Sequence, residues 1–480
     1  MPSPRPGTTT DVPPACHGPA SPTAPHSNQL KILRIYHAGR DPQHRARERA
    51  LVALGVDVKL VVPAQWQGPG SQDSLPPEPF EIIELPVRRP GDVNRHSYDE
   101  TDVAAVLASA EADLLDIHAE PVSVASRQWL AAAQPAGLPA VMYTAQNIDK
   151  RYPPPFSYYE REALRRIVGL YPCSRQAASV ARGKGFSGPL QVLPLGYDEG
   201  IFSAASNTPY DRSQRKEIVL GLVGRLSPEK GTLDAVRCLA SICRNRPARL
   251  KIVGTGPDQH ELLKLARELG VAGRLELRPW ASGEELAAAY RDFDVLLVPS
   301  LATSRWVEQF GRVIIEAQAS GTVVAAYATG SIPEVAGDSA VLVGPGDYGR
   351  LATEIQTVMG DPAEVERRRR LGLSNSARCG WHQVALAQSE LYERALAFAS
   401  ISPNSSGAQQ ANEAMASRHR RARAWKEYGP TAATPSGLRP FALPVLRDGW
   451  PLAAALGRAV DLAVDARDAS AFALARARQL

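Results

Sequence analysis

Long apolar runs are missing from this sequence. No stretch approaches the ~20 consecutive apolar residues that a membrane-spanning helix requires. The opening residues, MPSPRPGTTTDVPPACHGPASPTAP, also lack the apolar segment of a secretory signal. We therefore expect a cytoplasmic protein without an integral anchor, for which any contact with a membrane would be peripheral.

The sequence also has few cysteines and a small net charge. The five cysteines (Cys16, Cys173, Cys238, Cys243 and Cys379) are odd in number and follow no metal-ligand spacing, which predicts reduced thiols rather than disulfides or a metal site. Lys and Arg number 55 against 50 Asp and Glu, a net charge of +5. Because this excess is spread along the chain rather than gathered with aromatic residues, it argues against nucleic acid as a partner.

Two series of alternating strand and helix patterns divide the chain. The first begins with the apolar run KILRIYHAG, continues with a helical pattern that Gly55 ends, and returns to the buried run VDVKLVVP. The second begins after the polar residues 203–216, with EIVLGLVGRL as its first strand. Strands that alternate with helices in this way predict a parallel sheet covered on both faces.

These patterns predict two α/β domains of the doubly wound kind, a division that the length of 480 residues also favours. We expect a disordered lead (1–28), an N-terminal domain (29–202), a C-terminal domain (203–385) and a tail of unknown role (401–480). The lead is rich in Pro, Ser and Thr and has little apolar surface to bury. Two facing domains would form a cleft between the carboxyl ends of their sheets, where such sheets bind ligands.

The segment GLVGRLSPEKG (221–231) has the outline of a phosphate site. It follows a strand and leads into a helix, so that Arg225, Lys230 and the backbone around Gly224 would lie at a helix N-terminus. An ordinary strand-to-helix loop with two solvated cations is the competing interpretation. In IVGTGP, Gly254 and Gly256 follow another strand and would let a nucleotide approach the backbone closely.

The segment EQFGRVIIEAQASG (308–321) places two carboxylates eight positions apart. We expect a helix that starts near Gly311 and stops at Gly321, with Glu308 before it and Glu316 within it. Glu316 has apolar neighbours, and a buried carboxylate needs a partner. That partner would be a pair of sugar hydroxyls or a lysine or arginine of the chain.

In their order and spacing, VGRLSPEKG, VGTGP, VPS, EQFGRVIIEAQASG and GSIPEVAG resemble the retaining glycosyltransferases of family 4. The resemblance is close over about residues 215–345 and looser over about 370 residues. It implies the GT-B fold, in which two Rossmann-like domains face each other. It also matches the helix at 386–400 with the element that crosses back to the first domain in this fold.

The resemblance further implies a nucleotide-sugar donor, transfer with retention of configuration, and no metal ion or other cofactor. Arg225 and Lys230 would hold the donor diphosphate. Glu316 would bind the ribose hydroxyls, while Glu308 with the backbone of Phe310 and Gly311 would hold the donor sugar. The family often has a histidine where DIHAEP places His118, although a single histidine there is as readily structural.

The first domain departs from the family pattern. The usual adjacent glycines of its first loop are replaced in HAGRDPQHRARERA by Gly39 among several cations, which suggests an acidic or phosphorylated acceptor. A solvated helix face is the interpretation we favour for these cations. The segment TAQNIDKRYPPPF (144–156) suits an acceptor loop for a sugar, a glycan or a lipid-linked sugar.

Retention commonly uses two carboxylates about 5 Å apart. Two acids at the ends of an eight-residue, partly helical step would lie on the order of 10 Å apart, which is too far. We therefore expect front-face substitution, in which the leaving phosphate receives the acceptor's proton. Another GT-B enzyme, such as a sugar-nucleotide epimerase or a phosphorylase, and an inactive binding subunit are the alternatives.

Overall fold

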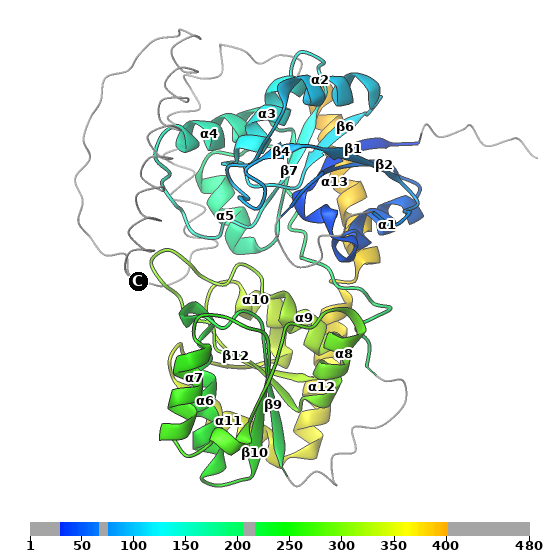
Figure 1. The fold of residues 1–480 in the computed structure, drawn as a ribbon. Coiled ribbons are helices and arrows are strands. Elements are labelled where there is room, and N and C mark those ends of the chain that lie inside the picture. Colours follow the sequence, from blue (N-terminus) through cyan, green and yellow to red (C-terminus); the bar gives the residue numbers. More distant parts are fainter. Residues whose placement is uncertain (1–28, 67–74, 205–216, 402–480) are drawn as a thin grey trace, which may run out of the picture.

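A computed structural model describes residues 29–66, 75–204 and 217–401. The predicted lead and nearly all of the tail lie outside these residues, as does most of the polar stretch 203–216. Figure 1 shows two α/β lobes stacked on each other, the first in blue to cyan and the second in green to yellow. In the described part of the chain, no helix combines the length and the apolar character needed to cross a membrane.

The first lobe contains a six-stranded parallel sheet in the order β3-β2-β1-β6-β7-β8. Its strands are β1 (Lys31–Ile35), β2 (Asp57–Pro63), β3 (Glu81–Leu85), β6 (Leu114–Ile117), β7 (Ala140–Thr144) and β8 (Gly169–Pro172). The helices are α1 (Ala46–Ala53), α2 (Glu100–Ser109), α3 (Val124–Ala133), α4 (Phe156–Arg166) and α5 (Arg175–Gly183). A short antiparallel pair, β4 (Val87–Arg88) and β5 (Ser97–Tyr98), precedes α2.

The second lobe repeats this design with the order β11-β10-β9-β12-β13-β14. Its strands are β9 (Ile218–Val223), β10 (Ala248–Val253), β11 (Leu275–Arg278), β12 (Val295–Val298), β13 (Val323–Tyr327) and β14 (Val341–Val343). Its helices are α6 (Thr232–Cys243), α7 (Gln259–Glu268), α8 (Gly283–Asp292), α9 (Arg312–Ala319), α10 (Ile332–Ala336), α11 (Tyr348–Gly360) and α12 (Pro362–Ala377). Both sheets have the strand order of the doubly wound Rossmann fold, and the predicted fold class is confirmed.

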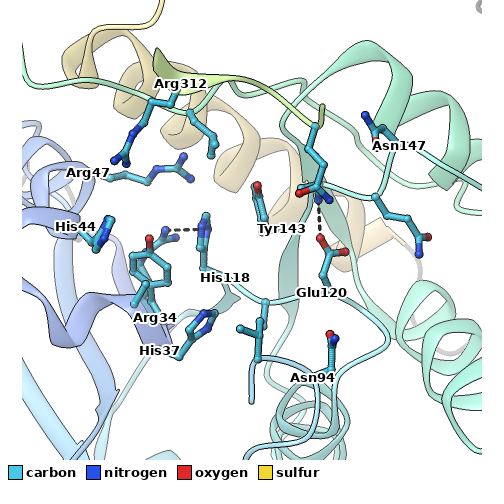
Figure 2. Close-up of a pocket in the computed structure, with 18 of the residues that line it drawn as sticks. Arg34, His37, His44, Arg47, Asn94, His118, Glu120, Tyr143, Asn147 and Arg312 are labelled. Atoms are coloured by element: carbon cyan, nitrogen blue, oxygen red, sulfur yellow. Dashed lines mark hydrogen bonds between the residues drawn. The ribbon is translucent and has the colours of Figure 1, made fainter. Parts of the chain in front are cut away.

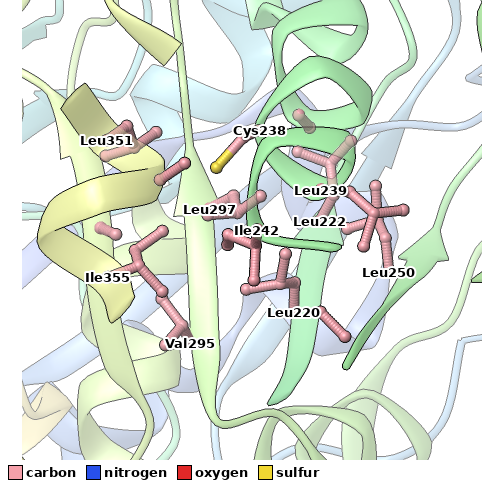
Figure 3. Close-up of a cluster of buried hydrophobic side chains, with 14 of the residues drawn as sticks. Leu220, Leu222, Cys238, Leu239, Ile242, Leu250, Val295, Leu297, Leu351 and Ile355 are labelled. Atoms are coloured by element: carbon pink, nitrogen blue, oxygen red, sulfur yellow. The ribbon is translucent and has the colours of Figure 1, made fainter. Parts of the chain in front are cut away.

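The cores explain why the alternating patterns fold in this way. On one face of the second sheet, leucines of β9 and β10 pack against α6 and α11, and Figure 3 shows Leu239 and Ile242 of α6 opposite Leu351 and Ile355 of α11. These four side chains are almost completely removed from water. The apolar side chains of α8 and α9 fill the other face. Parallel strands buried on both faces require near-continuous apolar runs, which the sequence supplies.

The last described helix, α13 (Trp381–Ile401), returns to the first lobe. Leu391 and Tyr392 are fully buried against Ile32 of β1 and Leu51 of α1. The first residue of α13, Trp381, precedes the predicted start at 386 and follows Gly380, whose backbone forms a β-bridge with Tyr197.

Candidate functional site

The two cations of the predicted phosphate loop take different positions. Gly231, in the left-handed conformation (φ 65°), ends a short 3-10 turn and leads into α6. Lys230 points away from this turn, and its Nζ donates to Glu308 Oε2 at 2.7 Å. Arg225 is exposed, and within the described residues its guanidinium makes no hydrogen bond or ion pair. The fold thus joins Lys230 to the second predicted motif and leaves Arg225 open to solvent.

Gly254 and Gly256 bring two loops of the second lobe together. Gly254 has a φ of +140°, and a Cβ atom there would overlap the carbonyl oxygen of Gly224. A Cβ atom at Gly256 would overlap the carbonyl oxygen of Leu226. The backbone amide of Leu226 donates to the carbonyl oxygen of Thr255 at 2.9 Å. The close packing of these two loops therefore requires both glycines, independently of any ligand.

Glu308 lies where the two lobes meet. Its side chain is 7% exposed and accepts hydrogen bonds from Lys230 and from the Ser300 hydroxyl at 3.0 Å. Its backbone carbonyl accepts from Asn147 Nδ2 of the first lobe at 2.8 Å. The following carbonyl, that of Gln309, lies 3.7 Å from Cys173 Sγ. The segment that contains Glu308 is thus fixed by contacts from both lobes.

Glu316 has the arginine partner that the sequence left open. Arg312 Nε lies 2.9 Å from Glu316 Oε1, and the Tyr290 hydroxyl donates to Glu316 Oε2 at 2.9 Å. These two contacts compensate the carboxylate, which is only 4% exposed, so its burial no longer requires sugar hydroxyls. Gly311, with a φ of 81°, is the N-cap of α9, and Phe310 belongs to the apolar core.

A cavity of about 450 Å³ opens at the carboxyl ends of β1, β6 and β7, and Gln309 and Arg312 of the second lobe contribute to its lining. Figure 2 shows His118 near its centre. The cavity is lined by Arg34, Tyr36, His37, Ala38, His44, Arg47, Glu48, Val93, Asn94, His118, Ala119, Glu120, Tyr143, Ala145, Gln146, Asn147, Ile148, Lys150, Tyr152, Leu195, Gln309, Arg312 and Trp381. The predicted acceptor segment 144–156 therefore contributes to this cavity.

His118 is held by aromatic rings and by a buried arginine. Its ring stacks on Tyr143 with a centroid separation of 4.1 Å, and Arg34 Nη2 lies 3.2 Å from Nδ1. Because a guanidinium can only donate, Nδ1 accepts and the proton of the neutral ring lies on Nε2. Burial, and then the charges of Arg34 and Arg47, lower the pKa of His118 well below its ordinary value.

Arg34 itself belongs to a buried polar network that the sequence patterns did not reveal. It pairs with Glu48 through Nε at 2.5 Å and with Asp116 through Nη1. Asp116 also accepts from Gln388 Nε2 of α13 at 2.9 Å, and from the hydroxyls of two tyrosines. The one available signal was a charged residue inside each of two apolar strands, KILRI and LLDI.

Three of the four arginines of HAGRDPQHRARERA are not on a solvated helix face, which corrects for them the interpretation favoured from the sequence. Arg40, Arg45 and Arg47 are at most 6% exposed. Residues 37–44 form two 3-10 turns instead of extending α1. Arg45 Nε, for example, donates to the Gly39 carbonyl at 2.6 Å.

Comparison with known proteins agrees with this geometry. Residues 209–377 match the family model "Glycosyl transferases group 1". The matches support a glycosyltransferase with the GT-B fold. A 2-deoxystreptamine glucosyltransferase of Streptomyces kanamyceticus is 28% identical over 307 residues, which are 59% of this chain and 78% of that protein.

A D-inositol 3-phosphate glycosyltransferase of Segniliparus rotundus is 31% identical over 227 residues, 45% of this chain. The chain spans about half (49%) of that relative's length. Among solved structures, the Anabaena protein HepE in complex with UDP and glucose has a TM-score of 0.58 at 18% identity, covering 76% of this chain and all of HepE. At that identity the likeness bears on the fold alone.

Proposed function

We propose that this protein is a retaining glycosyltransferase of family 4 that moves a hexose from a nucleotide-sugar donor to an acceptor bound in the first lobe. The observation that carries the proposal is the ion pair between Lys230 and Glu308. It joins two motifs 78 residues apart, inside the segment that matches group 1 glycosyl transferases and against Asn147 of the other lobe. A paired cation and carboxylate at the lobe junction suit a diphosphate and a sugar lying side by side.

In the proposed complex the donor lies on the second lobe. Arg225 and Lys230 stabilise the diphosphate, Glu308 and the backbone of Phe310 and Gly311 hold the sugar, and Glu316 binds the ribose. Arg312 and Tyr290 already bond to the Glu316 carboxylate, so the ribose hydroxyls would have to bond to the same oxygens beside one of these two residues. HepE, the structural neighbour solved with UDP and glucose, makes UDP the first nucleotide to test.

The proposed chemistry is a front-face substitution that uses no metal ion. The bond between the anomeric carbon and the diphosphate oxygen breaks, and the acceptor oxygen bonds to that carbon on the same face. The acceptor's proton passes to the leaving phosphate oxygen. Arg225 and Lys230 compensate the charge that grows on this oxygen, and the Nε2–H of His118 can donate to a sugar hydroxyl. Neither Glu308 nor Glu316 is an unpaired nucleophile, because each is already bonded to a cation.

A thermal-shift screen with UDP, GDP and their hexose conjugates tests the proposal. A ligand at 100 times its dissociation constant adds about 2.7 kcal/mol to the free energy of unfolding. Transfer from the stabilising donor should then persist in EDTA, and NMR should show the donor's anomeric configuration in the product. Conversion of the donor without an acceptor would point to an epimerase, and a requirement for free phosphate would point to a phosphorylase.

The acceptor is proposed to be a sugar, a glycan or a lipid-linked sugar. A lipid-linked acceptor would bring the protein to a membrane surface peripherally. Sedimentation of the protein with lipid vesicles distinguishes this case from a water-soluble acceptor, for which the protein stays in the supernatant.

A further inference from the structure

Two guanidinium groups, one from each lobe, line the same end of the cavity. Arg47 comes from α1, and Arg312 is the first residue of α9. Figure 2 shows both entering the pocket from one side, with His44 beside them. Burial, and then the charge of Arg312, lowers the pKa of His44. Arg312 of the second lobe therefore interacts electrostatically with a residue of the first lobe.

Within the part of the chain that the structure describes, Arg47 is a buried cation without a carboxylate partner. Its side chain is 2% exposed, and across the described ranges no Asp or Glu lies within ion-pair distance of it. Nη1 donates to Gln388 Oε1 at 3.0 Å, and the guanidinium lies over the rings of Tyr171 and Trp381 at 5.7 and 5.2 Å. These contacts fix the position of the guanidinium. Because a guanidinium has five N–H donors, most of the donors of Arg47 remain unused.

Arg312 also keeps donors for a ligand. Its Nε is used by Glu316, but the described residues supply no hydrogen bond to its terminal nitrogens. Its side chain is 44% exposed. Two planar forks with unused donors, brought together from two lobes, suit the bidentate recognition of a phosphate.

The carboxylates that line the cavity do not neutralise this end. Glu48 is held by Arg34 at 2.5 Å. Glu120 accepts from the Thr144 hydroxyl at 2.6 Å and from the Ala145 amide at 2.7 Å, and burial raises its pKa, which favours the neutral acid. Lys150 adds a further exposed cation to the lining.

We propose that Arg47 and Arg312 bind a phosphate group of the acceptor, so that the acceptor substrate is a phosphorylated compound. This inference rests on the proposed transferase function, because it assigns the cavity of the first lobe to the acceptor. The phosphate would span the two lobes and hold the acceptor hydroxyl near His118. A phosphate of the donor is the other possible source of the same chemistry, and the experiment separates the two.

Inorganic phosphate is the probe, titrated by calorimetry into the full chain with and without saturating UDP, or GDP if it stabilises the protein more. We expect phosphate to bind in the presence of the nucleotide. Arg312→Gln should weaken this binding roughly tenfold, the loss of one charge-assisted contact. Arg47→Lys, which keeps the charge and loses the fork, should weaken it severalfold. Arg350→Gln, an exposed arginine on α11, is the matched control and should change nothing.

Phosphate binding that the nucleotide abolishes would assign both arginines to the donor and overturn the proposal. So would equal phosphate affinity in wild type and Arg312→Gln. Because Arg312 also compensates the buried Glu316, thermal unfolding must show that this variant is folded, and Arg47→Lys gives the same test independently. If neither nucleotide binds the wild type, the proposed function fails. The titration without nucleotide then still decides whether the two arginines bind phosphate.

Discussion

At the scale of single residues, Arg225 and Lys230 differ in what else they stabilise. Lys230 compensates the buried Glu308, so its removal disturbs the segment at the lobe junction as well as any diphosphate. Arg225 has no such role among the described residues. Its substitution is therefore the cleaner test of the phosphate loop.

We expect Arg225→Ala to lower turnover about a hundredfold while the melting temperature stays within about 1 °C of wild type, because the lost contact is to charge that develops in the transition state. Steady-state rates and thermal unfolding measure both. Arg244→Ala, an exposed arginine after α6, is the control and should leave both values unchanged. Full turnover in Arg225→Ala would instead support the interpretation of this loop as an ordinary strand-to-helix connection.

Substitutions of the two glutamates should have different effects on nucleotide binding and on sugar transfer. Glu316→Gln loses charge-assisted bonds to the ribose, so affinity for the nucleotide sugar and for the bare nucleotide should both fall, by about tenfold. Glu308→Gln should reduce transfer, but it releases Lys230, so affinity for the bare nucleotide should not fall. Calorimetry with both ligands measures this, and an equal loss of bare-nucleotide affinity in the two variants would contradict it.

His118 should make the protein less stable in acid. Its folded pKa is depressed, so below its unfolded pKa of about 6.5 the unfolded chain binds a proton that the folded chain does not. The free energy of unfolding should fall by about 1.4 kcal/mol for each pH unit below 6.5 through this residue and should be unaffected by it above that pH.

Urea unfolding at pH 5.0 and 7.5 of wild type and His118→Asn measures this contribution. The variant should lose less stability than wild type between the two pH values. His260→Asn, an exposed histidine of α7, gives the comparison for a surface position. A wild-type pH dependence in His118→Asn would show that the ring is protonated in the folded state.

At the scale of elements, the contact between the two glycine loops is the most easily tested. Gly254→Ala places a methyl group on the carbonyl of Gly224 at a φ that alanine avoids, and should cost about 3 kcal/mol or more. Gly270→Ala places alanine at a positive φ of 70° in open space, within the left-handed region, and should cost only about 1 kcal/mol. Urea unfolding compares them, and equal costs would show that the loops do not touch.

Elements also show which boundaries the sequence predicts well. The helix expected between Gly311 and Gly321 is α9, because the positive φ values of both glycines mark its ends. The helical pattern RARERALVALG (45–55) corresponds to α1 (Ala46–Ala53), and residues 37–44 before it form 3-10 turns. The aspartate N-cap of the second turn, Asp41, and Pro42 break the helix there, and this local signal was present in the sequence.

At the scale of the whole molecule, α13 makes the first lobe depend on residues far along the chain. Residues 29–400 should fold and bind nucleotide, because neither flank contributes to the alternating pattern. Residues 29–380 should be insoluble or unfolded, because Leu391, Tyr392 and Ala395 would leave the core. Soluble yield and circular dichroism measure this. Loss of nucleotide binding in 29–400 would show that a flank packs on the enzyme.

Hydrophobic periodicity and glycine positions are local properties, and by themselves they determined the two doubly wound lobes, the α9 helix and the motifs of the second lobe. Contacts between residues far apart in the chain have no such local signature, because a side chain's partner depends on how the sheets twist and the lobes face each other. Only the tertiary structure therefore joined Lys230 to Glu308. The pair of Arg312 and Glu316 is local by contrast, because the two residues lie one turn apart on α9. The tertiary structure also buried the arginines near residue 45 and brought Arg47 to the same cavity as Arg312. A charged residue in a strand or helix is expected to be exposed unless a counter-ion or an aromatic ring compensates it, and the sequence does not show which distant residue does so.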